Sequence, residues 1–397
     1  MTAKDERSIL ILNVGSSTLK FGLFPLAGGD DPFLHGVLEY AGPASGKLRL
    51  DFSREGKTES LQLAATRESA AKELLGYLDS SSLFKSVQAV GHRLVHGGMK
   101  LCAPVVIDSA VRALLDEVVP LAPDHLPTEL RAIDEVSRSA PDVVQVACFD
   151  TAFHSAMPRV ARLVGLPRSL LDSGVIRYGF HGLSYEYVAD ALRNRGELPA
   201  RTIVAHLGNG ASIAALRDGL SIDTTMGLTP TGGIVMSTRS GDLDPGILLY
   251  LLRSRGFSAD DVDDAIKHKG GLLGISDTSG DVRDLLAECA TDSRAEEAIG
   301  VFCYQARKFI GGYAAALGGI DALVFTGGIG EHSPEVRARI CEGLGFLGIA
   351  IDTGLNRKNG ATISSTGSKV TVRTIRANEE AVIAKHTRHA LNPSLQG

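Results

Sequence analysis

The sequence predicts an α/β protein of two duplicated domains, each with a mixed sheet flanked by helices, around a central cleft. Residues 8–24 and residues 201–225 indicate this fold, because both read as an apolar strand, a turn of small and hydroxyl-bearing residues, and a second strand. A third short strand completes each copy. The repeat recurs about half a chain further on, which indicates internal duplication. A chain of 397 residues is also too long for one ordinary core.

The domain boundaries follow from this duplication. We expect residues 1–152 to form the first domain and residues 153–383 to form the second. The strand and helix at residues 370–391 need a surface on which to pack after the second core has closed. We therefore expect residues 384–397 to return to the first domain.

Composition describes an ordinary globular chain, with 44% hydrophobic and 22% charged residues. A net charge of −5 argues against a general nucleic-acid or anionic-membrane binder. No apolar run approaches the roughly 18 residues of a membrane span, and the charged start MTAKDERS does not resemble a secretory signal. The cysteines show no C-x-x-C spacing and no disulfide framework, so we expect a cytoplasmic protein.

The turn after the strand at residues 202–205 is the first candidate site. Gly208 to Gly210, followed by Ala211 and Ser212, carry no bulky side chains, so their backbone N–H groups can approach an anion closely. His206 and Asn209 add hydrogen-bonding side chains. The pattern predicts a phosphate cradle between two strands.

Charged residues near the ends of two further apolar strands are also candidates. Arg93 lies in the strand at residues 87–98, where pairing with a carboxylate and binding an anion are equally good interpretations. Asp150 directly follows the apolar strand at residues 143–149, a position where α/β folds place chemistry, although helix capping also explains it. A metal site at His92 and His96 is disfavoured, because no third ligand accompanies them.

Four later segments also carry candidate polar groups. His181 stands between glycines, and Arg239 lies in the long loop at residues 227–246. Residues 326–332 read as a glycine turn between a strand and a helix that begins at Ser333, which is a good nucleotide site. Glu379 and its neighbour begin the last helix, either as partners of the helix dipole or as Mg²⁺ ligands.

Taken together, eight motifs in order resemble the acetokinase family, within the actin-like ATPase and sugar-kinase superfamily. They are NVGSSTLKF at Asn13, GHRLVHGG at Gly91, FDTAFH at Phe149, RYGFHG at Arg177, HLGNGAS at His206, TRSGDLDP at Thr238, FTGGIGE at Phe325 and NEE at Asn378. The match runs essentially end to end. It implies two duplicated actin-like (ribonuclease H-like) domains, the first on the acyl and phosphate side and the second binding the nucleotide.

The resemblance implies reversible, ATP- and Mg²⁺-dependent phosphorylation of acetate to acetyl phosphate, by direct in-line transfer to the carboxylate. Mn²⁺ is a possible substitute metal. The implied partners are a small carboxylate and ATP, with no nucleic acid and no membrane, and the family implies a homodimer. Propionate or butyrate kinases, a non-catalytic actin-like nucleotide switch and a sugar kinase are the alternatives.

The resemblance also implies roles for individual residues. The catalytic residues would be Asp150, Arg93, His181 and Arg239. The acyl pocket would be lined by Val95, Leu121, Phe180 and Pro230. ATP would be bound by Lys20, His206, Leu207, Gly208, Asn209, Gly210, Asp281, Val282, Arg283, Gly328, Ile329, Gly330, Glu331 and His332. The metal would be held by Asn13 and Glu379.

The chain departs from the family pattern at several positions. Leu126 follows His125 where Asn is usual, Tyr185 replaces a frequent His, and His332 replaces a frequent Asn. None of these changes removes a proposed catalytic residue. They leave the preferences for the acyl chain and for the nucleotide open.

Overall fold

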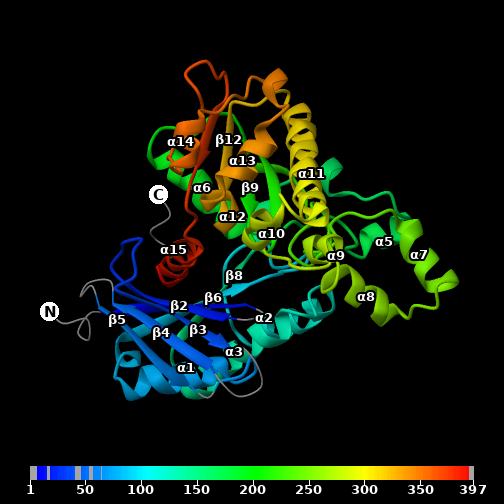
Figure 1. The fold of residues 1–397 in the computed structure, drawn as a ribbon. Coiled ribbons are helices and arrows are strands. Elements are labelled where there is room, and N and C mark those ends of the chain that lie inside the picture. The colour runs from blue at the N-terminus through cyan, green and yellow to red at the C-terminus, as the bar shows by residue number, and fades with distance from the viewer. Residues whose placement is uncertain (1–6, 16–17, 41–45, 53–56, 64, 393–397) are drawn as a thin grey trace. The chain divides into compact units, whose positions relative to one another are not determined.

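The computed structural model describes residues 7–15, 18–40, 46–52, 57–63 and 65–392, and the chain divides into two compact units (Figure 1). The first unit comprises Met1–Phe153 with Asn378–Gly397, and the second comprises His154–Ala377. The chain returns to the first unit at Asn378, ahead of the expected residue 384. The reason is that helix α15 (Glu379–Leu391) starts there as a whole, with Asn378 as its N-cap.

Within the described residues, eight strands form the sheet of the first unit, in the order β5-β4-β3-β2-β1-β6-β8-β7. The bounds are β1 Ser8–Val14, β2 Thr18–Pro25, β3 Leu34–Tyr40, β4 Gly46–Phe52, β5 Lys57–Leu63, β6 Val87–Leu94, β7 Val105–Val106 and β8 Val144–Phe149, with helices α1 Ala70–Ser80, α2 Ser109–Val118 and α3 Leu126–Ser139. Strands β1 to β5 are an antiparallel meander, whereas β6 pairs in parallel with β1 and β8.

Strand β1 has apolar side chains on both faces of the sheet, because successive residues point to opposite faces and nearly all of them are apolar. Helices therefore cover the sheet of the first unit. Leu10 and Leu12 join the core cluster that also contains Leu74 of α1 and Val136 of α3. Helix α15 packs against β1, β6 and β8. A Cβ atom at Gly91 of β6 would lie 2.4 Å from Thr387 Oγ1 of α15, so only glycine permits this close approach.

Five strands form the sheet of the second unit, in the order β11-β10-β9-β12-β13. The strands are β9 Arg201–Leu207, β10 Ala211–Arg217, β11 Leu220–Thr224, β12 Ala322–Thr326 and β13 Thr371–Thr374. The helices are α4 Arg159–Arg162, α5 Arg168–Asp172, α6 Gly182–Asn194, α7 Pro245–Ser254, α8 Ala259–Lys267, α9 Gly271–Ser276, α10 Val282–Glu288, α11 Ser293–Leu317, α12 Gly327–His332, α13 Pro334–Cys341 and α14 Thr353–Arg357. Strands β9 to β11 repeat the antiparallel meander of β1 to β3, and β12 pairs in parallel with both β9 and β13. The mixed sheets confirm the predicted fold class.

Several predicted elements differ from the structure. The predicted glycine turn at residues 327–332 is helix α12. The turn at residues 208–212 is shorter than predicted, because Ala211 and Ser212 already belong to β10. Ser16 and Ser17 of the first predicted turn lie outside the described residues.

Among the described residues, no helix has both the length and the apolar character to cross a bilayer.

Candidate active site

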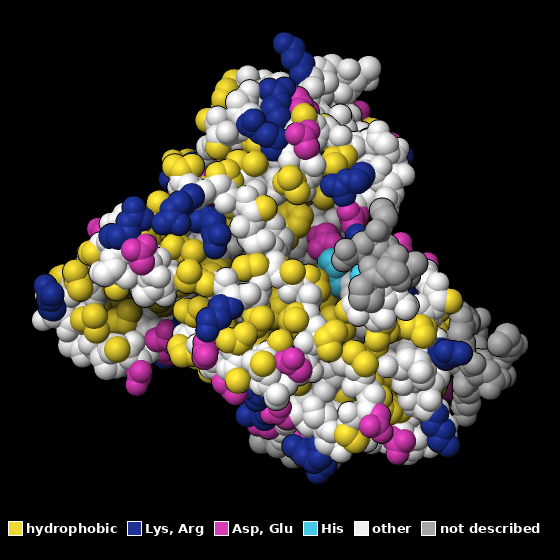
Figure 2. Space-filling model, turned by 180° about the vertical axis from the view of Figure 1, so that it is seen from behind, with side chains coloured by type: hydrophobic (Ala, Val, Ile, Leu, Met, Phe, Trp, Pro, Cys, Tyr) yellow, Lys and Arg dark blue, Asp and Glu magenta, His cyan; other side chains and the backbone are white. Residues whose placement is uncertain are grey.

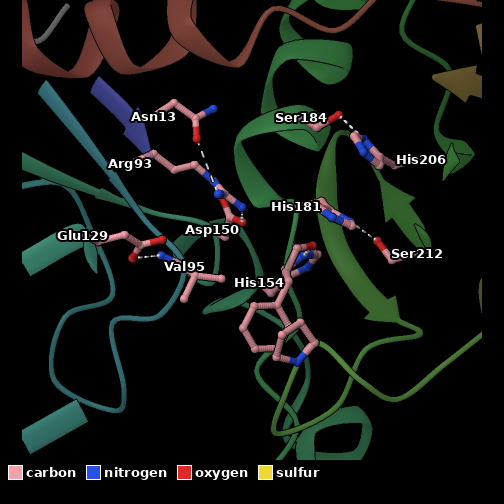
Figure 3. A network of polar contacts seen from close by, with 12 residues as sticks. Asn13, Arg93, Val95, Glu129, Asp150, His154, His181, Ser184, His206 and Ser212 are labelled. Carbon is pink, nitrogen blue, oxygen red and sulfur yellow. Dashed lines mark hydrogen bonds and ion pairs between the residues drawn. The ribbon is translucent and has the colours of Figure 1, made fainter. Parts of the chain in front are cut away.

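Arg93 and Asp150 meet at the carboxyl ends of two neighbouring strands. Leu94 of β6 pairs with Phe149 of β8, which places the residues around these strand ends beside each other. Arg93 Nη2 donates to Asp150 Oδ2 at 2.5 Å, and Nε donates to Oδ1 at 3.2 Å (Figure 3). Asp150 is only 1% exposed and the Arg93 side chain 16%. The structure therefore shows the carboxylate-paired interpretation of Arg93.

Two further groups of the first unit gather around Arg93. Asn13 Oδ1, on the adjacent β1, accepts a hydrogen bond from Arg93 Nη1 at 3.4 Å. Glu379, in the first turn of α15, interacts electrostatically with Arg93, Asp150 and Lys20. Burial raises the pKa of Glu379, although the Arg93 cation opposes this shift. Burial also acts to lower the pKa of Arg93. The Asp150 carboxylate stabilises the charged guanidinium by more than burial destabilises it, so the pKa of Arg93 is raised.

The donor set around Arg93 fits a magnesium ion that is bound mainly through a substrate. Among the described residues, no cluster of three His, Cys, Asp or Glu side chains could hold a metal by itself. Asn13 and Glu379 would offer two oxygen ligands to such an ion. Mg²⁺ commonly takes only one or two protein carboxylates, keeps several waters, and uses the phosphates of a nucleotide for the rest.

Glu129 is a site residue that the sequence reasoning missed. It lies on α3, is 1% exposed, and accepts the Val95 backbone N–H at its Oε2 over 3.0 Å. Its Oε1 has no hydrogen-bond partner in the described part of the chain. Burial raises the pKa of Glu129 to about 7, although Arg93 opposes the shift. The available signal was Pro127, a proline at the start of a helix that is followed by an acid.

His181 occupies a constrained position at the start of α6. Its backbone φ of 58° is left-handed, and Gly179 before it has a φ of 79°. A Cβ atom on Gly179 would lie 2.4 Å from the Thr224 methyl carbon, so this turn needs glycine. The His181 ring stacks on His206, with centroids 4.2 Å apart, and its Nδ1 lies 2.8 Å from Ser212 Oγ.

Buried polar side chains form hydrogen bonds to the turn that carries His181 and to its neighbours. His154 Nε2 donates to the carbonyl oxygen of Phe180 at 3.0 Å, and its Nδ1 lies 2.7 Å from Ser221 Oγ. Burial lowers the pKa of His154 to about 4, so the ring is neutral near pH 7 and carries its hydrogen on Nε2. Ser184 Oγ lies 2.8 Å from His206 Nδ1. The carbonyl before His181 is therefore held by His154, which in turn contacts Ser221 of β11.

The space above Gly210 is the strongest candidate for an anion site in the second unit. A Cβ atom built on Gly210 would lie 3.3 Å from His181 Nε2 and 3.7 Å from Arg239 Nη1. Arg239 Nη1 also donates to the carbonyl oxygen of Pro230 at 3.1 Å. His181 Nε2 and Arg239 Nη1 thus approach the same side of Gly210, where nitrogens that carry hydrogen could donate to an oxyanion or phosphoryl group.

The remaining predicted residues occupy two other segments of the second unit. Asp281 caps α10 by accepting the Arg283 backbone N–H at 2.7 Å, and it also pairs with the exposed Arg283 guanidinium. In α12, Glu331 Oε1 accepts the Gly327 N–H at 3.1 Å. Arg337 donates to the carbonyl oxygens of Gly330 and Glu331 at 2.8 and 2.9 Å.

The predicted acyl-pocket residues divide between the units. Val95 and Leu121 belong to the first unit, and Phe180 and Pro230 belong to the second. Val95 and Phe180 are buried, whereas the other two are partly exposed.

Comparisons with known proteins identify the family and the fold. The sequence model of the Acetokinase family matches residues 8–385. A curated relative, acetate kinase from Methylocella silvestris, is 42% identical over 96% of this chain and 97% of its own length. Acetate kinase from Coprothermobacter proteolyticus is 43% identical over 96% of this chain and 98% of its own length.

Solved structures show the same fold. A propionate kinase from Francisella tularensis superimposes with a TM-score of 0.90 and 35% identity, covering 96% of this chain and 99% of that one. The acetate kinase of Porphyromonas gingivalis gives a TM-score of 0.86 and 37% identity, covering 97% of this chain and all of that one. The fold and its polar groups define an α/β kinase of the actin-like class. The chain belongs to the acetokinase family.

Proposed function

We propose that the protein catalyses the reversible, Mg²⁺- and ATP-dependent phosphorylation of acetate to acetyl phosphate. The observation that carries this proposal is the convergence of His181 Nε2 and Arg239 Nη1 above Gly210, because it offers two donors to a transferring phosphoryl group. Two curated relatives of more than 40% identity carry the name acetate kinase, which supports acetate as the acceptor.

The chemistry requires charge neutralisation more than proton transfer. A short aliphatic carboxylic acid is ionised at pH 7, since its pKa of about 4 to 5 resembles that of side-chain carboxyls. The nucleophile therefore needs no strong base, and Asp150 is already engaged with Arg93. In this proposal Asp150 orients Arg93, Arg93 binds the substrate carboxylate, and His181 and Arg239 stabilise the charge on the transferring group.

The proposed Mg²⁺ would be held by Asn13 and Glu379 together with nucleotide phosphates, and would neutralise phosphate charge. The remaining ATP contacts would come from Lys20 and from Gly208 to Gly210. The segments at Asp281 to Arg283 and Gly328 to His332 would hold the nucleoside. Val95, Leu121, Phe180 and Pro230 would line the acyl pocket.

The test is an assay in which hydroxylamine traps acyl phosphate, with ATP, Mg²⁺ and one of acetate, propionate, butyrate or glucose. Acyl hydroxamate from acetate above the other acids is the expected result. Propionate is the second candidate, since the solved propionate kinase has the same fold. One methylene is worth only about 1–3 kcal/mol of discrimination, so preference for a longer acid would keep the mechanism and revise the pocket. Absence of product with every carboxylate would refute the proposal.

The surface of α7 fits an interface between two copies of this chain. None of its ten residues is buried, although Ile247, Leu249, Tyr250 and Leu252 are large and apolar. Figure 2 shows yellow side chains gathered at the edge of the second unit where this helix lies. We infer a homodimer, because exposed apolar patches of this kind mark association surfaces. The cysteines without a disulfide framework support a cytoplasmic location. Light scattering should give twice the chain mass, and Tyr250→Glu should reduce it to one chain.

A further inference from the structure

A cavity of about 420 Å³ lies in the second unit, and none of the residues that the proposed reaction uses lines it. Helix α11 lines one side of the cavity with Phe309, Gly312 and Tyr313. Asp223 of β11 and Asp242 of the following loop line it as well. Sites for small molecules are commonly cavities of about 300–1,000 Å³ with apolar walls and a few polar groups. This cavity therefore has the size and the lining of a ligand site.

Each of the two carboxylates has one oxygen committed to the backbone. Asp223 Oδ1 accepts the Thr224 N–H at 2.8 Å, and Asp242 Oδ1 accepts the Gly233 N–H at 2.7 Å. The second oxygen of each carboxylate, Oδ2, accepts no hydrogen bond from the residues that the structure describes. A carboxylate oxygen can accept two hydrogen bonds, so both side chains keep capacity for a donor in the cavity.

The cations near these carboxylates are engaged elsewhere. Arg177 Nη1 donates to three backbone carbonyl oxygens, those of Thr224, Thr225 and Met226. Arg177 Nε is 3.9 Å from Asp223 Oδ1, which is too far for a hydrogen bond. Lys308 also lines the cavity, but its Nζ lies 5.6 Å from the centroid of the Tyr304 ring. Burial raises the pKa of Asp223 although Arg177 opposes the shift, so Arg177 does not fully offset the burial of this carboxylate.

Tyr313 adds a buried hydroxyl without a partner. Its side chain is only 6% exposed, and its hydroxyl forms no hydrogen bond with any other residue in the described part of the chain. Burial raises the pKa of Tyr313, and the charges of Asp223 and Asp242 act in the same direction, which places this hydroxyl near both carboxylates. Buried hydroxyls normally have a hydrogen-bond partner. The missing partner of Tyr313 therefore points to a ligand that carries hydrogen-bonding groups.

The lining selects the charge and the shape of that ligand. Two carboxylates repel an anion and attract a cation. The rings of Phe309 and Tyr313 lie 5.9 Å apart between centroids, and aromatic rings attract organic cations as well as apolar groups. A bare metal ion would leave these rings uncovered, and within the described residues no three His, Cys, Asp or Glu side chains form a metal-binding group. An organic cation satisfies both kinds of surface.

We propose that this cavity binds a small primary ammonium compound with an apolar body. Its N–H groups would donate to Asp223 Oδ2, Asp242 Oδ2 and the hydroxyl oxygen of Tyr313. Its apolar body would pack against the ring of Phe309. The inference goes beyond the proposed function and does not rest on it, because binding can be measured in the absence of ATP and acetate.

The test is a calorimetric titration of the full chain with 2-phenylethylammonium chloride, which carries one ammonium group on an apolar body. We expect a Kd of about 1 mM or lower. The uncharged 2-phenylethanol, of similar size, should bind at least about tenfold more weakly. Asp223→Asn keeps an acceptor for the Thr224 N–H but removes the charge, and it should also weaken ammonium binding at least about tenfold. No heat up to about 10 mM ammonium, or equal affinity for the alcohol, would overturn the proposal.

Two glycines of α11 locate the bound ligand. Beyond the local helix, a Cβ atom on Gly311 or on Gly312 would meet no atom within 4 Å, and only Gly312 lines the cavity. Leucine favours a helix more than glycine does, so we expect Gly311→Leu and Gly312→Leu to fold with thermal midpoints at or above that of the wild type. Gly312→Leu should fill the cavity and abolish binding, whereas Gly311→Leu should keep the Kd within about twofold. Equal affinities of the two variants would place the ligand elsewhere and overturn the proposal.

Magnesium tests the competing inorganic ligand. The titration is repeated in MgCl₂ and in NaCl of equal ionic strength. We expect the same Kd for the ammonium compound in both salts, because two carboxylates and a phenol do not make a magnesium site. A Kd that rises only in MgCl₂ would assign the cavity to a metal ion and overturn the choice of an organic cation.

Discussion

Arg93 and Asp150 form a bidentate ion pair at the ends of parallel strands, with contacts of 2.5 and 3.2 Å. Because both oxygens of Asp150 already accept from the guanidinium, the carboxylate fixes the plane in which Arg93 presents its remaining N–H groups. One of these, on Nη1, reaches Asn13 at 3.4 Å. The pair thus orients a cation within a buried group of side chains.

The first prediction concerns Arg93→Ala. We expect kcat for acyl phosphate formation to fall about 10²–10³-fold, because one charged donor is lost. The change also leaves Asp150 buried without its partner, which costs roughly 3–5 kcal/mol of folding stability. Steady-state kinetics and urea unfolding measure the two effects.

Arg201→Ala is the matched control. Arg201 forms a similar bidentate pair with Asp321, but its side chain is 38% exposed. We expect its activity to stay within about twofold of the wild type and its stability to change much less than that of Arg93→Ala, because an exposed ion pair is screened by solvent. Near-normal turnover in Arg93→Ala would remove Arg93 from the mechanism.

The second prediction concerns Arg239→Ala. Arg239 donates to the Pro230 carbonyl and lies beside the space above Gly210. We expect kcat to fall about 10²–10³-fold while the protein remains folded. Arg255→Ala, at the exposed end of α7, is the control for the loss of one arginine. Equal kcat values in the two variants would be incompatible with the role given to Arg239.

The sequence predicts the meanders, and it suggests candidate site residues, because both kinds of signal are local. The alternation of Leu19 and Phe21 shows which face of β2 is buried. The small residues Gly208 to Gly210 indicate a turn from local sequence alone. The pairing of Arg93 with Asp150 was one of two open interpretations. Only the register of β6 with β8 reveals this pairing, and a single sequence does not contain that register.

Other features depend on contacts that are remote in sequence. The two glycines that open α12 are turn signals, yet the segment is helical, and Arg337 donates to its last carbonyl oxygens. Glu129 was missed for a similar reason. The buried position of Glu129 depends on the packing of α3 against β6 and on the hydrogen bond from the Val95 N–H. The local sequence pattern reveals neither contact.

The third prediction concerns Glu129 and pH. Burial raises the pKa of Glu129 from 4.5 to about 7. A raised carboxyl pKa means that the folded state holds the proton more tightly than the unfolded state. The stability that this proton provides is present below pH 4.5 and is lost as the pH rises through 7. Glu129→Gln keeps an acceptor for the Val95 N–H but does not titrate.

Between pH 5 and pH 8 the wild type should therefore lose stability that Glu129→Gln does not lose. The unfolding free energy of Glu129→Gln should rise relative to that of the wild type by at most about 3 kcal/mol. Urea unfolding at each pH measures the difference. Glu117→Gln, at an exposed residue paired with Lys100, controls for the removal of one negative charge. A constant difference across this range would show that Glu129 does not titrate there.

The fourth prediction concerns Arg337, whose fully buried guanidinium connects α12, α13 and α14. Besides its bonds to Gly330 and Glu331, it donates to Asn356 Oδ1 and O at 2.8 Å each, and to Asn359 Oδ1 at 2.7 Å. Burial lowers the pKa of Arg337 to about 10, which still leaves it charged at pH 7.

Arg337→Met should destabilise the protein by about 3 kcal/mol or more, because several buried carbonyl oxygens lose their donor together. Since α12 carries proposed nucleoside contacts, we expect the KM for ATP to rise while the KM for acetate stays within about twofold. Arg339→Met is the matched control on the same helix, because Arg339 pairs with Glu296 and Glu335 at the surface. That variant should lose about 1 kcal/mol or less and keep both KM values. Equal stability of the two methionine variants would show that the buried guanidinium does not hold α12 in place.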